Sequence, residues 1–423
     1  MIEEIRSIRP TKSVNAEIQV PPSKSYTNRA LIAAALAEGT SNIHHPSRSD
    51  DSTFLIAALR NFGITINDHD NKLEIHGSNG KLKAPTSEIF IGNAGTAMRF
   101  LASFACLAEG ETILIGDEQM NKRPISDLVN ALISNSIKCS CQNGFPPVKI
   151  HGGNFIGGRI NVDASLSSQF VSSILLSSPY AKRPVSLHVN GKLSSMPYVD
   201  MTLHVMRSFG AFIDTIEMKT FTIDNKQRYI GHDFIIEPDA SSASYFFGAA
   251  AITKGKVIIK NLPSESLQGD MNFLSVLSDM GCTIFRHTDS IEIQGGQLHG
   301  IDIDMNEMPD CVPTLAVIAS FAKGATTIRN VKQLRYKETD RLTALETELK
   351  KIGMKVKVSS DELIVYPQPS HGAIIETYND HRIAMSFAIA GLMVKGIAIQ
   401  NPGCVNKSFP NFWEEFKKLE KKD

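Results

Sequence analysis

Several basic side chains stand where they would weaken a helix. Lys24, Arg123 and Lys337 each lie at or just before the start of an apolar run with helical spacing. Because a helix N-terminus already carries partial positive charge, a cation there is locally unfavourable. Unpaired N–H groups at the same helix starts attract anions, so the pattern predicts a site for substrates with several negative charges, such as phosphate and carboxylate. The remaining members of this set are Arg29, Arg341, Arg382 and Lys407.

Small polar residues open other helical runs and would complete such a site. Ser25 follows Lys24 in the first run, and Gly95 opens the second. Hydroxyl, amide and backbone N–H donors at such positions can bind phosphate oxygens. Taken alone, a pair of serines is equally well explained as a polar helix start, so the prediction depends on the joint pattern. The third run opens with Ser167, Ser168 and Gln169.

Two carboxylates interrupt the basic pattern. Asp310 begins the fifth long helical run, and Glu338 stands between Lys337 and Arg341. Among cations a carboxylate stays ionised, yet its neighbours can tune it to move a proton. The pair therefore suggests proton transfer during group transfer between anionic partners. Two simpler interpretations remain: Asp310 as a plain N-cap, and Glu338 with Arg341 as a solvated helical ion pair worth about 0.3–0.5 kcal/mol.

Motifs and composition exclude several other functions. The 423 residues contain no GxxxxGK[ST], HExxH or GxSxG motif, which leaves nucleotide hydrolysis, zinc hydrolysis and serine esterase chemistry unsupported. Lys and Arg balance Asp and Glu at 44 each, so bulk charge gives no case for nucleic acid or a membrane. Cys139 and Cys141 form the only close cysteine pair, too few for zinc. Without a signal peptide or an apolar span, we expect a cytoplasmic protein.

The elements that must position these residues recur six times along the chain. Each copy has a polar opening, an Ala- and Leu-rich helical run, a Gly and a strand-like stretch, at a spacing of about 70 residues. A second helical run lies between successive copies, so two helices alternate with strands in each repeat. This alternation is typical of the α/β class. The copies begin near Pro22, Asn93, Ser167, Asp239, Asp310 and Asp380.

The sixth repeat ends after its second helical run, whereas the other copies continue into two strand-like stretches. The N-terminal stretches Ile5–Arg9 and Ala16–Val20 have strand character and could supply the missing strands, which would close the last repeat. Proline breaks regular structure at both resulting crossings. We therefore expect two domains with a hinge and a cleft. One comprises 1–20 plus 236–423, with repeats four to six, and the other 21–235, with repeats one to three.

With these residues assembled, the chain resembles the 5-enolpyruvylshikimate-3-phosphate synthases, within the enolpyruvyl transferase family. The match follows family order over nearly the whole length and is highly specific as a set. The matching segments are PPSKSYTNRA (21–30), GNAGTAMR (92–99), KRP (122–124), SSQF (167–170), SMPYVDMTL (195–203), DASSASYF (239–246), KETDRL (337–342), NDHRIAM (379–385) and CVNKSFP (404–410).

The resemblance implies a reaction and a fold. The family transfers the enolpyruvyl group of phosphoenolpyruvate to the 5-hydroxyl of shikimate 3-phosphate and releases phosphate, on the route to chorismate and the aromatic amino acids. It needs no metal or cofactor. The implied fold is an inside-out α/β barrel of three repeats in each of two domains, which close over the substrates. The implied oligomeric state is a monomer.

By matching motifs, the resemblance also implies residue roles. Asp310 would take the 5-hydroxyl proton, Glu338 would donate a proton to the methylene carbon, and Lys24 would be shared between the two substrates. Shikimate 3-phosphate would contact Lys24, Ser25, Arg29, Ser167, Ser168, Gln169, Ser195, Asp310, Gln333 and Lys337. Phosphoenolpyruvate would contact Lys24, Gly95, Arg123, Gln169, Arg341, Arg382 and Lys407.

Two positions depart from the family pattern. Gln333 stands where Asn is usual, although the longer amide could still reach a substrate. Phe100 follows GNAGTAMR where many members have Pro, so sensitivity to the inhibitor glyphosate does not carry over.

Two rival hypotheses remain. A UDP-N-acetylglucosamine enolpyruvyl transferase would share the architecture but carry a reactive cysteine in a loop that corresponds to Glu109–Lys122, where this chain has none. A non-catalytic repeat scaffold, such as a nucleic-acid clamp, would need a basic surface, which the balanced charge disfavours.

Overall fold

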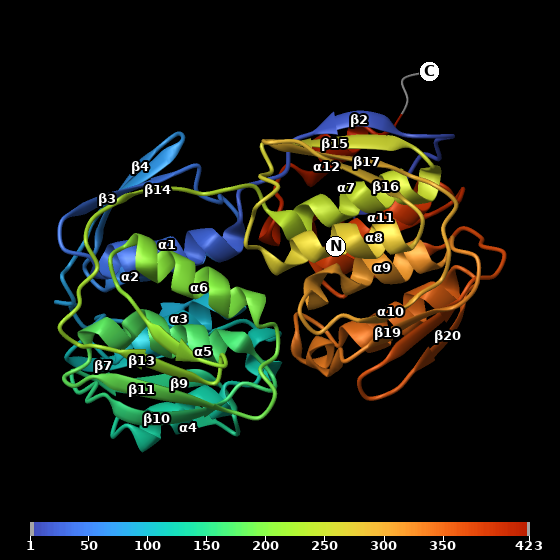
Figure 1. The fold of residues 1–423 in the computed structure, drawn as a ribbon. Helices are drawn as coiled ribbons and strands as arrows, with labels where there is room; N and C mark the ends of the chain where they lie inside the picture. The colour runs from blue at the N-terminus through green and yellow to red at the C-terminus, as the bar shows by residue number, and fades with distance from the viewer. Residues whose placement is uncertain (1–3, 421–423) are drawn as a thin grey trace. The chain divides into compact units, whose positions relative to one another are not determined.

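The computed structural model describes residues 4–420 and has a mixed α/β fold (Figure 1). The chain divides into two compact units, each of which is described by itself. Unit 1 combines Met1–Pro21 with Glu237–Asp423, and unit 2 comprises Pro22–Ile236.

Unit 2 contains three four-stranded sheets with a common plan. In each sheet the first two strands run parallel and the other two pair antiparallel. The strand orders are β14-β3-β5-β4, β6-β7-β9-β8 and β10-β11-β13-β12. The strands are β3 (Thr40–His44), β4 (Thr65–His69), β5 (Lys72–His76), β6 (Ile89–Phe90), β7 (Gly110–Ile115), β8 (Lys138–Gln142), β9 (Phe145–Gly152), β10 (Gly158–Asp163), β11 (Val185–Asn190), β12 (Asp214–Ile216), β13 (Thr220–Ile223) and β14 (Asp233–Ile235).

Unit 1 repeats this plan with two four-stranded sheets and one three-stranded sheet. The strand orders are β16-β17-β15-β2, β18-β19-β21-β20 and β1-β23-β22. The strands are β1 (Ile5–Ser7), β2 (Asn15–Ile18), β15 (Lys256–Lys260), β16 (Thr283–Arg286), β17 (Ser290–Gln294), β18 (Asp302–Asp304), β19 (Thr326–Arg329), β20 (Lys355–Val358), β21 (Leu363–Tyr366), β22 (Ile374–Ile375) and β23 (Ala398–Gln400).

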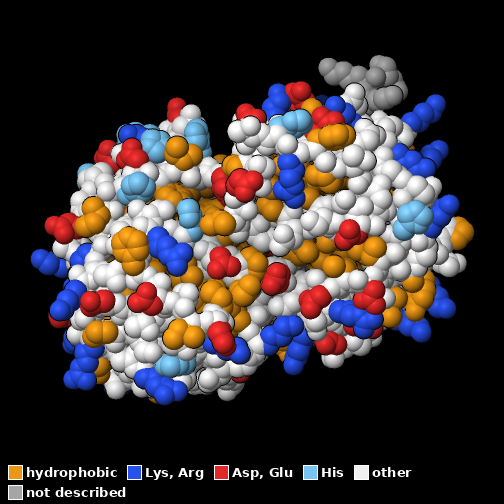
Figure 2. Space-filling model, in the orientation of Figure 1, with side chains coloured by type: hydrophobic (Ala, Val, Ile, Leu, Met, Phe, Trp, Pro, Cys, Tyr) orange, Lys and Arg blue, Asp and Glu red, His pale blue; other side chains and the backbone are white. Residues whose placement is uncertain are grey.

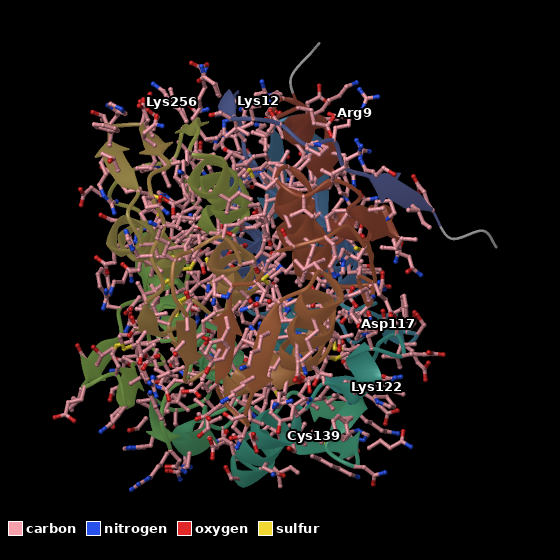
Figure 3. The ribbon with its side chains drawn as sticks, turned by 90° about the vertical axis from the view of Figure 1, so that its right-hand side faces the viewer. Arg9, Lys12, Asp117, Lys122, Cys139 and Lys256 are labelled. Atoms are coloured by element: carbon pink, nitrogen blue, oxygen red, sulfur yellow. The ribbon has the colours of Figure 1, made fainter. Side chains whose placement is uncertain are left out.

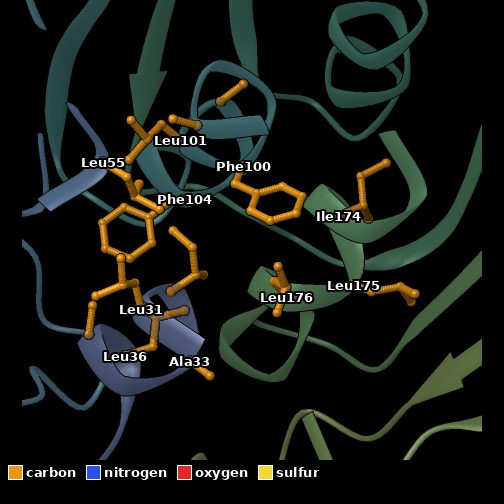
Figure 4. Close-up of a cluster of buried hydrophobic side chains, with 14 of the residues drawn as sticks. Leu31, Ala33, Leu36, Leu55, Phe100, Leu101, Phe104, Ile174, Leu175 and Leu176 are labelled. Atoms are coloured by element: carbon orange, nitrogen blue, oxygen red, sulfur yellow. The ribbon is translucent and has the colours of Figure 1, made fainter. Parts of the chain in front are cut away.

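Three long helices contact one another at the centre of each unit, with the sheets outside them. In unit 2 these are α1 (Lys24–Leu36), α3 (Gly95–Ala105) and α5 (Ser168–Ser177), whose apolar side chains meet in Figure 4. In unit 1 they are α7 (Ala240–Thr253), α9 (Val312–Ala319) and α11 (His381–Gly391). The other helices are α2 (Asp50–Asn61), α4 (Ser126–Ser134), α6 (Pro197–Ser208), α8 (Phe273–Asp279), α10 (Arg341–Lys351) and α12 (Phe412–Lys417), with short 3-10 turns η1 (Met120–Lys122), η2 (Ser178–Tyr180), η3 (Gly269–Asn272), η4 (Pro309–Cys311), η5 (Lys332–Tyr336) and η6 (Pro402–Lys407).

Small residues allow the central helices to pack this closely. Every residue of α7 is buried, as its Ala- and Ser-rich sequence predicts for an internal helix. A Cβ on Gly248 would lie 2.8 Å from Ile389 of α11 and 3.0 Å from Thr314 of α9, so a larger residue at this crossing would force these side chains to shift. Buried hydroxyl groups form hydrogen bonds with one another across the same helices. Thr314 Oγ1 lies 3.3 Å from both Ser244 Oγ and Ser386 Oγ.

The N-terminal strands pair differently from each other, and the structure corrects one expectation. β1 pairs antiparallel with β23 and so joins the sheet of the sixth repeat, as expected. β2 pairs parallel with β15 in the sheet of the fourth repeat, so the expectation that it closes the last repeat is wrong. The reason lies at the third repeat: β14, which precedes α7 in sequence, pairs with β3 instead of β15 and leaves that edge to β2.

The surface carries charges of both signs. On the face shown in Figure 2 the basic and acidic side chains are interspersed, in keeping with a formal net charge of zero. Arg9 and Lys12 of unit 1 and Lys122 of unit 2 are exposed and are labelled in Figure 3. Within residues 4–420, no helix has both the length and the apolar character that crossing a membrane requires.

Candidate active site

Asp310 lies at the centre of a charged cluster in unit 1. It belongs to η4, directly before α9, and its side chain keeps 18% of its surface exposed. Its Oδ1 accepts hydrogen bonds from Lys337 Nζ at 3.3 Å and from Arg341 Nη1 at 3.1 Å. Its Oδ2 accepts from Arg382 Nη2 at 2.8 Å. The carboxylate is therefore more than a plain N-cap, because three cations from separate segments converge on it.

Arg341 connects three carboxylates from inside the unit. Its side chain is 1% exposed and also donates from Nη2 to Glu338 Oε2 at 2.6 Å. Its Nε donates to Asp380 Oδ2 at 2.8 Å, and Asp380 is fully buried as the N-cap of α11. The alternative of a solvated pair between Glu338 and Arg341 is therefore wrong, because both side chains are buried and Glu338 precedes α10.

The cluster holds four cations and three carboxylates. Lys407, at the end of η6, places its Nζ 3.8 Å from Glu338 Oε1. With Lys337, Arg341 and Arg382 it exceeds the charge of Asp310, Glu338 and Asp380 by one. A partly buried cluster with excess positive charge favours an anionic ligand.

The cations set the ionisation of Asp310. Burial alone would raise the pKa of this carboxyl group, but Arg382, Lys337 and Arg341 outweigh burial and hold its pKa well below the usual range. On Arg341, burial lowers the pKa, but the three carboxylates outweigh burial and raise it. Asp310 is therefore fully ionised at neutral pH and can accept a proton once its cations turn to another anion.

The start of α1 carries the first cluster of site residues in unit 2. Lys24 is the first residue of the helix, and its Nζ lies 2.9 Å from Oδ2 of Asp51, which is buried in the first turn of α2. Ser23 caps the helix by accepting from the Tyr26 N–H. The carboxylate of Asp51 offsets the unfavourable charge of Lys24 at this helix start.

Arg29 is a buried cation held mainly by neutral oxygens. It is 1% exposed and donates to Thr202 Oγ1, to the Ser25 carbonyl oxygen and to the Tyr198 carbonyl oxygen, each at 2.8 Å. Its guanidinium also lies over the Phe100 ring at 5.3 Å. Burial lowers its pKa to about 10. A buried guanidinium whose hydrogen bonds go to neutral groups carries a charge that these groups do not neutralise, so it favours a bound anion.

Gly95 and Arg123 are in direct contact. A Cβ added to Gly95, the first residue of α3, would lie 2.5 Å from Arg123 Nη2. Arg123 is buried, and its Nη1 donates to the carbonyl oxygen of Asn93 at 3.3 Å and to Asn93 Oδ1 at 3.2 Å. Glycine is thus required for the guanidinium to lie against the start of α3.

The start of α5 meets the start of α3. Gln169 Nε2 donates to Thr96 Oγ1 at 3.2 Å, and Ser167 caps α5 by accepting from the Gln169 N–H. Ser168 is buried in the first turn of α5. Ser195, just before α6, is buried and has a φ of 57°. The structure thus brings the polar starts of α3 and α5 together within unit 2.

Gln333 has its hydrogen-bond partner outside the charged cluster. It is buried in η5, and its Nε2 donates to the carbonyl oxygen of Asn306 at 3.5 Å. Sequence reasoning missed Asp51, which pairs with Lys24, and named Asp380 only as the start of the sixth repeat. A carboxylate in the first turn of a helix is too common to have singled out Asp51.

Within residues 4–420, no group of three or more His, Cys, Asp or Glu side chains is arranged to hold a metal ion. The cysteines of the described chain are free thiols, and Cys106 and Cys282 are buried as their apolar surroundings predict.

Fold and site together define an α/β protein of repeated units whose helix starts gather cations, hydroxyls and two candidate proton-transfer carboxylates. The family model of EPSP synthase (3-phosphoshikimate 1-carboxyvinyltransferase) matches residues 8–416. The chain belongs to this family.

Curated relatives and solved structures agree with this assignment. The chain is 42% identical to a 3-phosphoshikimate 1-carboxyvinyltransferase of Trichormus variabilis, over 96% of this chain and 97% of the relative. It is also 42% identical to the protein of the same name from Yersinia ruckeri, over 99% of both chains. An EPSP synthase structure from Acinetobacter baumannii superposes with a TM-score of 0.81 at 28% identity, with 98% of both chains covered.

Proposed function

We propose that the chain transfers the enolpyruvyl group of phosphoenolpyruvate to the 5-hydroxyl of shikimate 3-phosphate and releases phosphate, in the synthesis of chorismate and the aromatic amino acids. The observation that carries this proposal is the cluster around Arg341, which places a base candidate and an acid candidate on one guanidinium, with Asp310 on Nη1 and Glu338 on Nη2. Family membership supplies the substrates.

The reaction needs one base and one acid at the same carbon. In the addition step, the 5-hydroxyl oxygen bonds to C2 of phosphoenolpyruvate as Asp310 takes its proton, and Glu338 gives a proton to C3, which becomes a methyl group. In the elimination step, the Glu338 carboxylate takes back a methyl proton, the double bond reforms, the C2–O bond to phosphate breaks, and the proton held by Asp310 passes to the departing phosphate. Phosphate leaves with the electron pair of that bond, so atoms and charges balance.

The cations bind the substrate anions and also set the pKa of the base. Arg341, Arg382 and Lys407 bind phosphoenolpyruvate in this proposal, while Lys337 binds shikimate 3-phosphate. Each cation that turns toward a substrate anion withdraws charge from Asp310 or Glu338, which raises the pKa of the carboxyl group and makes it a better base. Fixed cations also stabilise the departing phosphate, so the proposal includes no metal and no cofactor.

Unit 2 contributes binding residues. Arg29, with its unmet preference for negative charge, and the donors Ser25, Ser167, Ser168, Gln169 and Ser195 hold shikimate 3-phosphate. Gly95 and Arg123 bind phosphoenolpyruvate together with Gln169, and Lys24 contacts both substrates. Gln333 is a weaker candidate for shikimate 3-phosphate because its amide bonds to Asn306. We further propose that the enzyme acts in the cytoplasm as a monomer of two functional domains, 1–20 plus 236–423 and 21–235.

The test is phosphate release from phosphoenolpyruvate, measured separately with shikimate 3-phosphate and with UDP-N-acetylglucosamine. We expect steady release with the first acceptor and none above background with the second. Asp310→Asn is the matched control, since the same fold should then release little phosphate with either acceptor. A folded wild-type sample that is inactive with shikimate 3-phosphate would disprove the proposal, and turnover with the sugar nucleotide would establish the rival enzyme.

A further inference from the structure

Tyr245 is a polar side chain inside the charged cluster of unit 1 that the mechanism above does not use. It lies in the second turn of α7, the central helix whose start has no basic residue, and the sequence of this segment suggests only a cap and a hinge. Tyr245 is fully buried, and its ring packs edge-on against Phe412 at 6.1 Å. A buried tyrosine carries a polar hydroxyl into the interior, so its oxygen needs a hydrogen-bond partner.

The partner of the Tyr245 hydroxyl is Arg382. Arg382 Nη1 lies 3.0 Å from the phenolic oxygen, and because a guanidinium can only donate, the hydroxyl accepts. The other arm of the same guanidinium, Nη2, donates to Asp310 Oδ2 at 2.8 Å. Arg382 is therefore held at both ends of its fork, with a neutral oxygen on one side and the base candidate on the other.

The neutral character of the phenol matters for Arg382. Burial raises the pKa of Tyr245, so the hydroxyl stays protonated throughout the working pH range. A carboxylate at this position would fix the orientation of Arg382 but would also neutralise it. The phenol fixes the orientation and leaves the positive charge available for Asp310 or for an anionic substrate.

We propose that Tyr245 is a positioning residue, which holds the Arg382 guanidinium so that Nη2 faces Asp310 and the incoming phosphoenolpyruvate. The inference rests on the proposed function. Tyr245 acts through Arg382, since it is fully buried and, within residues 4–420, has Arg382 as its hydrogen-bond partner. Without the hydroxyl, Nη1 loses this acceptor, and the orientation of the guanidinium is less tightly fixed.

The test is Tyr245→Phe, which removes one oxygen and keeps the ring against Phe412. We expect the KM for phosphoenolpyruvate to rise about tenfold, while the KM for shikimate 3-phosphate and kcat stay within about threefold of wild type. The matched control is Tyr229→Phe in unit 2, where an equally buried hydroxyl donates to the Leu176 carbonyl oxygen at 2.9 Å. This control should leave both KM values unchanged.

A second variant tests the route through Arg382. Arg382→Lys cannot span both partners, so it should raise the KM for phosphoenolpyruvate by itself, and Tyr245→Phe added to it should change that KM by less than about twofold. Independent effects that multiply in the double variant would overturn the inference, as would an unchanged KM in Tyr245→Phe. Those results require an active wild type, whereas a wild type inactive with shikimate 3-phosphate disproves the proposed function and the inference together.

Discussion

The two units have the same arrangement of central helices and outer sheets but place different chemistry at the helix starts. In unit 2 the starts of α1, α3 and α5 present hydroxyls, an amide, a glycine and cations, and Arg29 is held mainly by neutral oxygens. In unit 1 the starts of α9, α10 and α11 hold three carboxylates tied to four cations. The comparison indicates that the repeated fold supplies similar anion-attracting positions in both units, and in the proposed mechanism the side chain at each position determines whether it binds substrate or transfers a proton.

The difference in carboxylates has an electrostatic consequence. The cations of unit 1 already pair with carboxylates, so each must give up a carboxylate contact when it binds a substrate oxygen. Substrate binding in unit 1 is therefore coupled to the pKa of Asp310. The hydrogen bonds of Arg29 in unit 2 go to three neutral oxygens, so a bound anion adds charge pairing without such an exchange. We therefore expect substitutions of the Asp310 and Glu338 carboxylates in unit 1 to change kcat most, and substitutions of the binding residues in unit 2 to change KM.

The largest effect should come from Asp310→Asn. The amide keeps the shape of the side chain but cannot take the hydroxyl proton, so kcat should fall by about 10²–10⁴. The substitution also frees positive charge, so the Kd for shikimate 3-phosphate should stay within a few-fold of wild type. Steady-state kinetics and calorimetric titration check the two expectations, and a kcat within tenfold of wild type would show that Asp310 is not the base.

Arg29→Lys should give the next largest effect, and it should act on KM instead of kcat. Lysine keeps the charge but cannot donate to Thr202, Ser25 and Tyr198 at once, so the KM for shikimate 3-phosphate should rise by about 10–100-fold, the equivalent of losing one charge-assisted hydrogen bond. We expect kcat to fall by less than the KM rises. A drop in kcat with an unchanged KM would contradict the assignment of Arg29 to binding.

Gly95→Ala should act selectively on phosphoenolpyruvate. The added methyl group would lie 2.5 Å from Arg123 Nη2, so the guanidinium must move away from the start of α3. We expect the KM for phosphoenolpyruvate to rise about tenfold, which corresponds to about 1.4 kcal/mol, with the KM for shikimate 3-phosphate unchanged. Equal increases in both KM values would indicate a general distortion of unit 2 instead.

The last effect concerns stability and its pH dependence instead of kinetics. The pKa of Asp310 is depressed in the folded protein, so its ionic contacts stabilise the fold above the unfolded pKa of about 3.9 and are lost as pH falls through the folded value. Asp310→Asn lacks this contribution, so its free energy of unfolding should be lower than that of wild type by about 1–3 kcal/mol at pH 7. The difference should shrink below about pH 4. Chemical denaturation at pH 7 and at low pH measures this change, and a difference that grows on acidification would contradict the assigned pKa direction.

Much of the fold could be predicted because its signals are local. The Ala- and Ser-rich run after Asp239 is typical of a buried helix, and every residue of α7 is buried there. The partner of β2 could not be predicted, since a short alternating strand fits any open sheet edge. That edge is open only because β14, more than 200 residues later in the chain, pairs with β3.

The site shows the same limit. Basic residues at helix starts break a local rule, which made Lys24, Arg341 and Arg382 visible in the sequence. Asp51, Asp380 and Tyr245 obey local rules as a first-turn acid, an N-cap and a core aromatic residue. Their pairing with those three cations depends on contacts across 27, 39 and 137 residues of sequence, and it appears only in the folded structure.

The proposed difference in role between the two units is tested most directly by comparing Asp310→Asn and Arg29→Lys with wild type. For each variant, the Kd for shikimate 3-phosphate and kcat are measured side by side. We predict that Asp310→Asn binds shikimate 3-phosphate within a few-fold of wild type while losing at least about 10² in kcat. We predict that Arg29→Lys binds it at least about tenfold more weakly while losing less than that in kcat. The reverse pattern, with weak binding in Asp310→Asn and a kcat defect alone in Arg29→Lys, would contradict the account.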